Sequence, residues 1–257
     1  MIDLSQLSPM MQHYMETKKE YPDCVLFYRL GDFYEMFFDD ALTVSKELEI
    51  TLTGKDCGLS ERAPMCGVPF HALDSYLYRL VQKGYKVAIA EQMEDPRQAK
   101  GLVKREVIRV VTPGTITSSQ VLDETKNNYL MGIVYMDGIY GISTADISTG
   151  DFMVTEVDSD RELFDEINKF SPSEIICNNA FYMSGVDMDE LKNRYQVVIS
   201  ALDSRFFGEE SCRRILMEHF KVGALVGLGL EDYATGIIAA GAVMQYIYET
   251  QKSTLEH

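Results

Sequence analysis

The sequence predicts an α/β protein of two domains: a mixed-sheet α/β domain in the first half and a second α/β domain after it. Three observations support this. In the first half, short apolar runs typical of strands alternate with helical periodicity. Residues 113–128, PGTITSSQVLDETKNN, are rich in Ser, Thr, Asn and Asp and carry no core pattern, which is typical of a connector. The second half opens with three strand-like runs and continues as alternating helices and strands.

The elements of the first half follow from local signals. Ser8-Pro9 predicts a helix start, because proline is favoured at the first helical position, and Tyr21-Pro22-Asp23 predicts its end. The run CVLFYRL (24–30) predicts a buried strand, with FYEMF as its continuation or its hairpin partner. Further helices are expected over 39–49 and 71–84, the latter closed by Gly84, and further strands in YKVAIAEQ (85–92) and KREVIRVV (104–111).

The second half begins with the runs NYLMGIVYM (128–136), IYGISTADI (139–147) and GDFMVTEV (150–157). Asp137-Gly138 and Ser148-Thr149-Gly150 join them and are hairpin signals. Helices are then expected over 161–170, 187–195, 209–220 and about 231–251, with strands over 174–178 and 197–202. An antiparallel meander followed by αβαβα predicts a ribonuclease H-like layout for the second domain.

Composition excludes several classes of protein. The five cysteines form no C-x-x-C pair, which argues against a disulfide framework or a thiolate zinc site and favours reduced, buried thiols. No apolar run approaches the ~20 residues that span a bilayer, and the start resembles no secretory signal, so we expect a cytoplasmic protein. The net charge of −16 argues against nonspecific attraction to nucleic acid, but it is uneven. Residues 1–115 carry 14 Lys/Arg against 17 Asp/Glu, whereas residues 116–257 carry 10 against 23.

Catalytic signatures are weak. Gly54-Lys55 is followed by Asp56 and does not form a phosphate-binding loop, and the histidines are isolated. A ribonuclease H-like order raises the alternative of a metal-dependent nuclease, which needs converging carboxylates. The first strand of the meander has no acid, and Asp146 and Asp151 lie near a hairpin turn, where acids are usually turn residues. The second half is therefore interpreted as a scaffold.

The stretch GDFYEMF raises a sharper question. Strand alternation puts Phe33, Glu35 and Phe37 on one face, and a buried unpaired carboxylate there would be costly. The pattern therefore predicts that Phe33 and Glu35 lie at the exposed end of the strand, projected by a Gly31-Asp32 turn. On pattern alone, a strand end with a surface acid is favoured over a recognition element. A fragment that only binds proteins, with an inert Phe33, stays a further alternative.

A resemblance changes this balance. The blocks LSPMMQHY, LFYRLGDFYEMFFDDA, APMCGVPFHA, AIAEQMEDP and REVIRVVTPGTIT occur in this order and resemble the N-terminal region of the bacterial MutS mismatch-repair family. The resemblance implies a mismatch-recognition domain over 1–113, a linker over 114–128 and a connector domain over 129–252. Residues 253–257 are expected to be a tail that contains the remnant of a tag.

The resemblance also implies roles for individual residues. Phe33 would wedge into the minor groove and stack on a mispaired base, Glu35 would hydrogen-bond that base, and Lys55 and Arg105 would approach the DNA backbone. Arg105 belongs to a basic run, RQAKGLVKREVIR, that fits the expectation of a positive patch in the first half.

The implied partners are duplex DNA with mispairs or small loops, a MutL-type repair protein at the connector, and a second copy in the full-length homodimer. ATP and Mg would bind in an ATPase domain outside this fragment. We therefore expect no enzymatic activity and no cofactor here, no membrane, and only weak duplex binding by the isolated chain.

Overall fold

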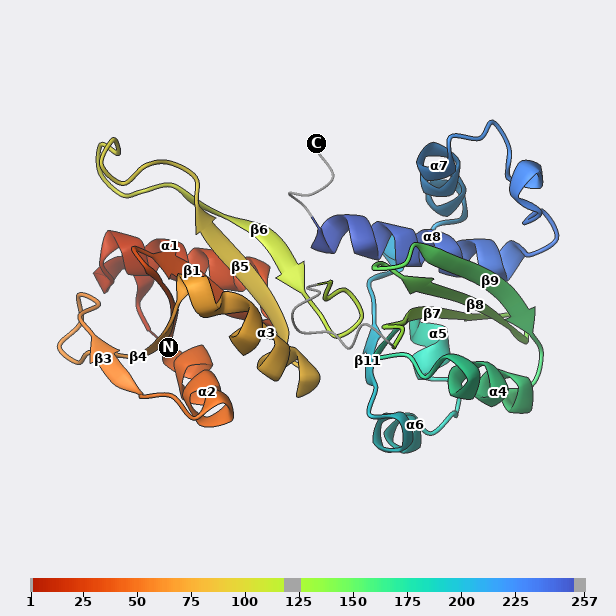
Figure 1. The fold of residues 1–257 in the computed structure, drawn as a ribbon, viewed down its shortest axis with the longest axis horizontal. Coiled ribbons are helices and arrows are strands. Elements are labelled where there is room, and N and C mark those ends of the chain that lie inside the picture. Colours follow the sequence, from red (N-terminus) through yellow and green to blue (C-terminus); the bar gives the residue numbers. More distant parts are fainter. Residues whose placement is uncertain (1, 118–125, 252–257) are drawn as a thin grey trace. The chain divides into compact units, whose positions relative to one another are not determined.

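The computed structural model describes residues 2–117 and 126–251 (Figure 1). These residues form two compact units, which divide between Thr112 and Pro113. The tail over 253–257 and residues 118–125 of the expected linker lie outside the described residues. Within the described ranges, no helix is long and apolar enough to span a membrane. The fold is mixed α/β in both units, which confirms the predicted class.

The first unit is built on a six-stranded sheet in the order β3-β4-β2-β1-β5-β6. Its strands are β1 (Cys24–Leu30), β2 (Phe33–Phe37), β3 (Thr53–Lys55), β4 (Ala63–Pro69), β5 (Lys86–Gln92) and β6 (Arg105–Val111). β1 and β5 run parallel, and every other neighbouring pair is antiparallel. FYEMF is therefore the hairpin partner of CVLFYRL, one of the two predicted possibilities. The hairpin of β3 and β4 was not predicted.

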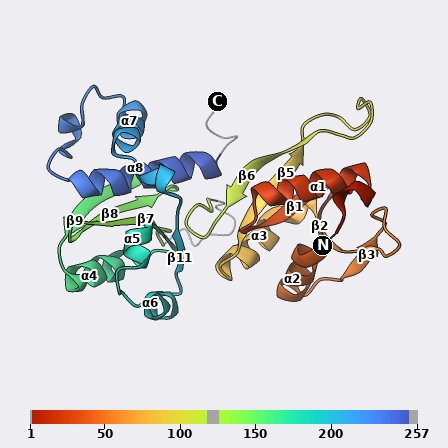
Figure 2. The ribbon, with the colours of Figure 1, turned by 180° about the vertical axis from the view of Figure 1, so that it is seen from behind.

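Three helices cover this sheet: α1 (Pro9–Glu20), α2 (Phe38–Leu48) and α3 (Leu73–Gln82). α1 lies on one face and α2 and α3 on the other, as Figures 1 and 2 show. On the α1 face, Tyr14 packs its ring edge-on against Phe37, with ring centres 4.9 Å apart. The short 3₁₀ helices η1 (Leu4–Gln6) and η2 (Phe70–Ala72) precede α1 and α3.

The second unit holds a five-stranded sheet in the order β11-β10-β7-β8-β9. Its strands are β7 (Leu130–Met136), β8 (Ile139–Asp146), β9 (Asp151–Val157), β10 (Glu174–Cys177) and β11 (Val198–Ala201). β7, β8 and β9 form the predicted antiparallel meander, β10 runs parallel to β7, and β11 parallel to β10. This order and these directions confirm the ribonuclease H-like layout.

Helices cover both faces of this second sheet. They are α4 (Asp160–Phe170), α5 (Asn179–Tyr182), α6 (Met188–Tyr195), α7 (Glu209–Phe220) and α8 (Ala234–Thr250), with the short η3 (Ser204–Phe207) and η4 (Leu225–Leu228). α8 lies along one face with α7 outside it, and α4, α5 and α6 cover the other (Figure 1). All five cysteines are free and buried, as predicted, and burial raises the pKa of the Cys66 thiol to about 12.

A buried carboxylate ties together two distant parts of the second unit. Glu174, the first residue of β10, is fully buried. Its Oε1 accepts a hydrogen bond from the Gly114 backbone N–H at 3.0 Å, and its Oε2 accepts one from the Tyr246 hydroxyl on α8 at 2.6 Å. The segment over 113–116 is itself buried. The start of this unit and the last turns of α8 therefore contact the same side chain.

Candidate nucleic-acid interface

The β1–β2 hairpin presents an aromatic side chain at its tip. Leu30 pairs with Phe33, so Gly31 and Asp32 form a two-residue turn, as predicted. Gly31 takes a φ of 60°, the left-handed value that a type II′ turn requires at its first central position and that favours glycine. Phe33 begins β2 directly after the turn, and 47% of its surface is exposed. This is a large apolar ring left in solvent at the end of a strand.

The turn is held in place by groups of Arg29 and Phe70, which no local pattern singles out. Arg29 Nε donates to the Gly31 carbonyl oxygen at 2.5 Å, and its guanidinium lies 4.1 Å from the centre of the Phe70 ring. The Phe70 backbone N–H donates to the Asp32 carbonyl oxygen at 2.9 Å. Both turn carbonyls therefore have partners, which restrains the tip that carries Phe33.

The Arg29 guanidinium is in turn anchored on a carboxylate. Arg29 Nη1 lies 3.4 Å from Glu91 Oε1, and the Tyr34 hydroxyl donates to Glu91 Oε2. Burial, followed by the hydrogen bond to Glu91, raises the pKa of Tyr34 to about 12. The phenol therefore stays a hydrogen-bond donor over the whole physiological range of pH. No sequence motif pointed to this support, because its members come from β1, β2 and β5.

Glu35 has a partner that the strand pattern did not reveal. Its Oε2 lies 2.8 Å from Lys55 Nζ, and the Glu35 and Lys55 side chains are 14% and 29% exposed. Glu35 lies opposite Gly67 of β4, so no side chain stands directly between it and β3 on this face. The acid expected to need an exposed strand end is instead mostly covered and ion-paired.

All four predicted site residues share one face of the first sheet. Opposite residues in paired strands point to the same face of a sheet. Glu35 lies opposite Gly67 and Tyr28, and the register of the neighbouring strands puts Lys55 and Arg105 on the same face. This is the face that α1 covers. Phe33, two residues from Glu35, shares this face. The structure thus brings Phe33, Glu35 and Lys55 together. The backbone of Arg105 lies three strands from β2, but its guanidinium reaches β1 beside Tyr28, the residue opposite Glu35.

Arg105 is a buried side chain, with 5% of its surface exposed. Its guanidinium donates to the carbonyl oxygens of Arg29 at 2.7 Å and Val103 at 2.8 Å. It also lies 4.9 Å from the centre of the Tyr28 ring. Two of the five guanidinium N–H groups are thus used within the protein, which gives Arg105 a role in the fold.

The basic run around Arg105 lies at the same end of the sheet as Phe33. Because β1 and β5 are parallel, the loop after β5 leaves the sheet beside the Gly31-Asp32 turn. Figure 1 shows this loop, residues 93–104, reaching well beyond the strands. Arg97 and Lys104 each face an acid, Asp95 at 3.6 Å and Glu106 at 2.9 Å. The positive charge of the run is therefore partly neutralised.

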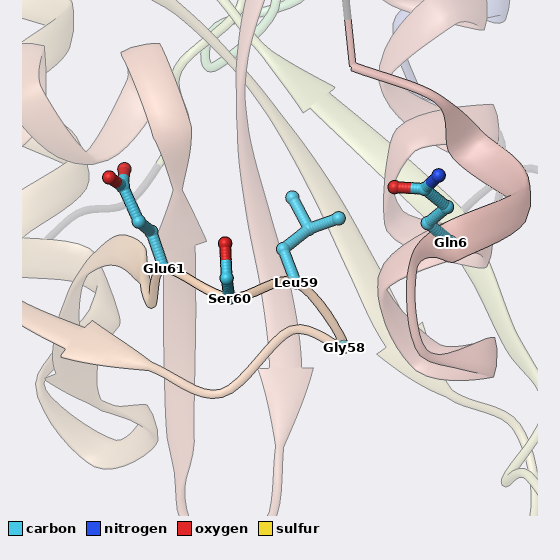
Figure 3. Close-up of a pocket in the computed structure, with 5 residues that line it drawn as sticks. All are labelled: Gln6, Gly58, Leu59, Ser60 and Glu61. Carbon is cyan, nitrogen blue, oxygen red and sulfur yellow. The ribbon is translucent and has the colours of Figure 1, made fainter.

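A recess of about 630 Å³ lies elsewhere in the first unit. Figure 3 shows its lining residues, Gln6 from η1 and Gly58, Leu59, Ser60 and Glu61 from the segment between β3 and β4. None of the four predicted site residues lines it. We assign it no function.

The acid that motivated the nuclease alternative is part of a turn. Asp146 is 1% exposed, and its Oδ1 accepts from the Ser148 backbone N–H at 2.9 Å and from the Ser148 hydroxyl at 2.6 Å. Its Oδ2 accepts from the Asn128 backbone N–H at 3.1 Å. Asp151, its cross-strand partner, is exposed. In the part of the chain that the structure describes, no group of three or more His, Cys, Asp or Glu side chains could hold a metal ion.

The fold and the site define a two-domain α/β protein whose first domain presents an exposed aromatic on a braced hairpin. Sequence comparison gives the family: the model described as MutS domain I matches residues 8–120, and that of MutS domain II matches residues 128–257. The chain belongs to the MutS family.

Relatives agree with this assignment. The chain is 61% identical over 254 residues to the DNA mismatch repair protein MutS of Lachnoclostridium phytofermentans, which covers 99% of this chain and 27% of that protein. It is 53% identical over 257 residues to the DNA mismatch repair protein MutS of Acetivibrio thermocellus, which covers 99% of this chain and 29% of the relative. The chain therefore spans less than a third of the length of these relatives.

Proposed function

We propose that this chain takes part in DNA mismatch repair, with the first unit recognising mispaired duplex DNA and the second serving as a connector. The observation that carries the proposal is the exposed Phe33 ring on a hairpin tip whose two turn carbonyls are both hydrogen-bonded. A rigid aromatic can enter the minor groove and unstack a base step. A mispaired step is easier to unstack and kink than a paired one, so such a wedge detects deformability and not sequence.

Glu35 supplies discrimination in this proposal. A carboxylate brought close to phosphates is repelled, and a hydrogen bond from a mispaired base compensates for that repulsion. In a fully paired duplex the donors of the Watson–Crick edges are already used between the strands, so the acid weakens binding to undamaged DNA more than to mispaired DNA. Glu35 shares its face and its strand with Phe33, two residues away, which supports a joint role.

Lys55 and Arg105 stay predictions as contacts to the DNA backbone. Lys55 has a partly exposed ammonium, which supports contact, whereas the burial of Arg105 weighs against it. For the second unit we propose contact with a MutL-type repair protein, because the acidic half of the chain suits a protein surface better than DNA. In this proposal, homodimerisation belongs to the full-length protein, and so does the binding of ATP and Mg in an ATPase domain. We propose the cytoplasm as the location of that protein.

The test is a binding titration in a full-length MutS protein that carries this chain as domains I and II. A duplex with one G·T mismatch is compared with its matched twin at fixed salt, because salt alone changes affinity strongly. Base–aromatic stacking is worth about 1–3 kcal/mol, so Phe33→Ala should lower the preference for the mismatch about tenfold or more while matched-duplex binding changes little.

Leu42→Ala is the matched control, because Leu42 on α2 is also about half exposed, at 48%, and lies on a helix that covers the other face of the sheet. It should leave the preference unchanged. If the preference survives Phe33→Ala, the proposed role of the hairpin is wrong and the fragment that only binds proteins becomes the better interpretation.

A further inference from the structure

We propose that Lys55 is a positioning residue for Glu35: it fixes the carboxylate through one oxygen and leaves the other for the mispaired base. Lys55 then determines specificity instead of only adding affinity for phosphates. This inference rests on the proposed function of Glu35 and deepens it.

The geometry singles out one of the two carboxylate oxygens. Glu35 Oε2 accepts from Lys55 Nζ at 2.8 Å, and no described residue bonds Glu35 Oε1. The Glu35 side chain is only 14% exposed, so its few rotamers are further restricted by the contact. An ionised carboxylate with one oxygen occupied is a directional acceptor for a single donor.

The path of the lysine side chain explains why this contact forms. Lys55 lies on β3 and Glu35 on β2, with β4 between them. Gly67 of β4, opposite Glu35, has no side chain, so the lysine side chain can cross β4 at this position. The Lys55 ammonium also lies 5.9 Å from the centre of the Phe37 ring, on the face that α1 covers. The Lys55 ammonium thus lies between the Glu35 carboxylate and the Phe37 ring.

Charge gives the pair a second effect. The ammonium offsets part of the Glu35 charge in the free protein, so the repulsion between the carboxylate and the phosphates is reduced but not removed. A partly exposed ion pair contributes little to stability, so its main effect here is to orient the Glu35 carboxylate. Lys55 therefore orients the acid and moderates its charge.

A double-mutant cycle tests the inference in the full-length protein that carries this chain as domains I and II. The measured quantity is the ratio of the matched-duplex Kd to the G·T-duplex Kd, together with its salt dependence. Lys55→Met should lower this ratio about three- to tenfold, the range of one oriented hydrogen bond. In a Glu35→Gln background, Lys55→Met should leave the ratio unchanged, because there is no carboxylate to position. Lys55→Arg should restore most of the ratio.

Lys83→Met is the matched control, because Lys83 forms an ion pair of similar length with Glu47, 2.9 Å, at the end of α3. It removes the same charge and should leave the ratio unchanged. Thermal unfolding of each variant shows whether it folds.

Two results would overturn the inference. One is a Lys55→Met variant that weakens both duplexes equally and reduces the salt slope by about one, which is the signature of a phosphate contact alone. The other is an equal change of the ratio with and without the Glu35 carboxylate. Failure of the proposed function looks different, because then Glu35→Gln by itself leaves the ratio unchanged.

Discussion

Glu35 in the first unit and Asp146 in the second are the two acids for which the sequence suggested chemistry, and their surroundings differ. Glu35 has one lysine partner, and both side chains keep some exposure to solvent. Asp146 is buried and accepts hydrogen bonds from three backbone N–H groups and one hydroxyl. A carboxylate can serve a ligand when its own partner is exchangeable, and Asp146 does not meet that condition.

Lys55 and Arg105, the two cations predicted to contact the DNA backbone, differ in the same way. Lys55 contacts the side chain of Glu35, whereas Arg105 donates to two main-chain carbonyl oxygens. A contact between side chains can be exchanged for a ligand without disturbing the backbone. A contact to the backbone is part of the fold, so its loss should appear as lost stability.

The largest effect is expected at Asp146. Replacing it by Ala leaves buried donors without acceptors, which should lower the free energy of unfolding by about 3 kcal/mol. Urea denaturation of the chain measures this, with exposed Asp151→Ala as the control at about 0.5 kcal/mol or less. Equal, small losses of stability at both positions would show that Asp146 is not a structural acid, and the contrast with Glu35 would then be wrong.

An intermediate effect is expected at Arg105. Arg105→Met strips two carbonyl oxygens of a charged donor in a buried place and should cost about 2 kcal/mol of stability. The neighbouring Lys104, whose side chain is 67% exposed, should tolerate the same change within about 0.5 kcal/mol. Denaturation curves of the two variants test this. A stable Arg105→Met variant that loses DNA affinity would instead revive Arg105 as a backbone contact.

The smallest effect is expected at Glu35. Glu35→Gln breaks a partly exposed ion pair and keeps the shape of the side chain, so stability should change by less than about 1 kcal/mol. Thermal unfolding at low and high salt measures it, and salt should shrink even this difference. A loss of about 2 kcal/mol or more would class Glu35 with Asp146 as a structural acid.

The order of elements was predictable because local signals agreed with the fold. The Ser8-Pro9 helix start, the apolar run CVLFYRL and the Asp137-Gly138 turn each act over a few residues, and the structure has a helix, a strand and a hairpin at these places. The β3–β4 hairpin was missed for a physical reason. Thr53–Lys55 is too short for a pattern, and β4 begins and ends near prolines, Pro64 and Pro69, which argue against a strand.

The site was predictable only in part. The exposure of Phe33 followed from a carboxylate two residues away on a strand. The partner of Glu35 did not, because Lys55 is 20 residues distant and reaches it across β4. The burial of Arg105 was not predictable either, because a run of basic residues is typical of a solvated face. Only the tertiary fold brings its guanidinium to the Arg29 carbonyl oxygen near the end of β1.

Glu174 links the first residues of the second unit to its last helix. The chain enters this unit beside Gly114 and leaves it through α8, and both places are hydrogen-bonded to the same carboxylate. A displacement of residue 114 relative to the sheet would strain its hydrogen bond to a carboxylate that also holds Tyr246 of α8. One buried carboxylate thus ties the first residues of the unit to its last helix, and a substitution at Glu174 would free both at once.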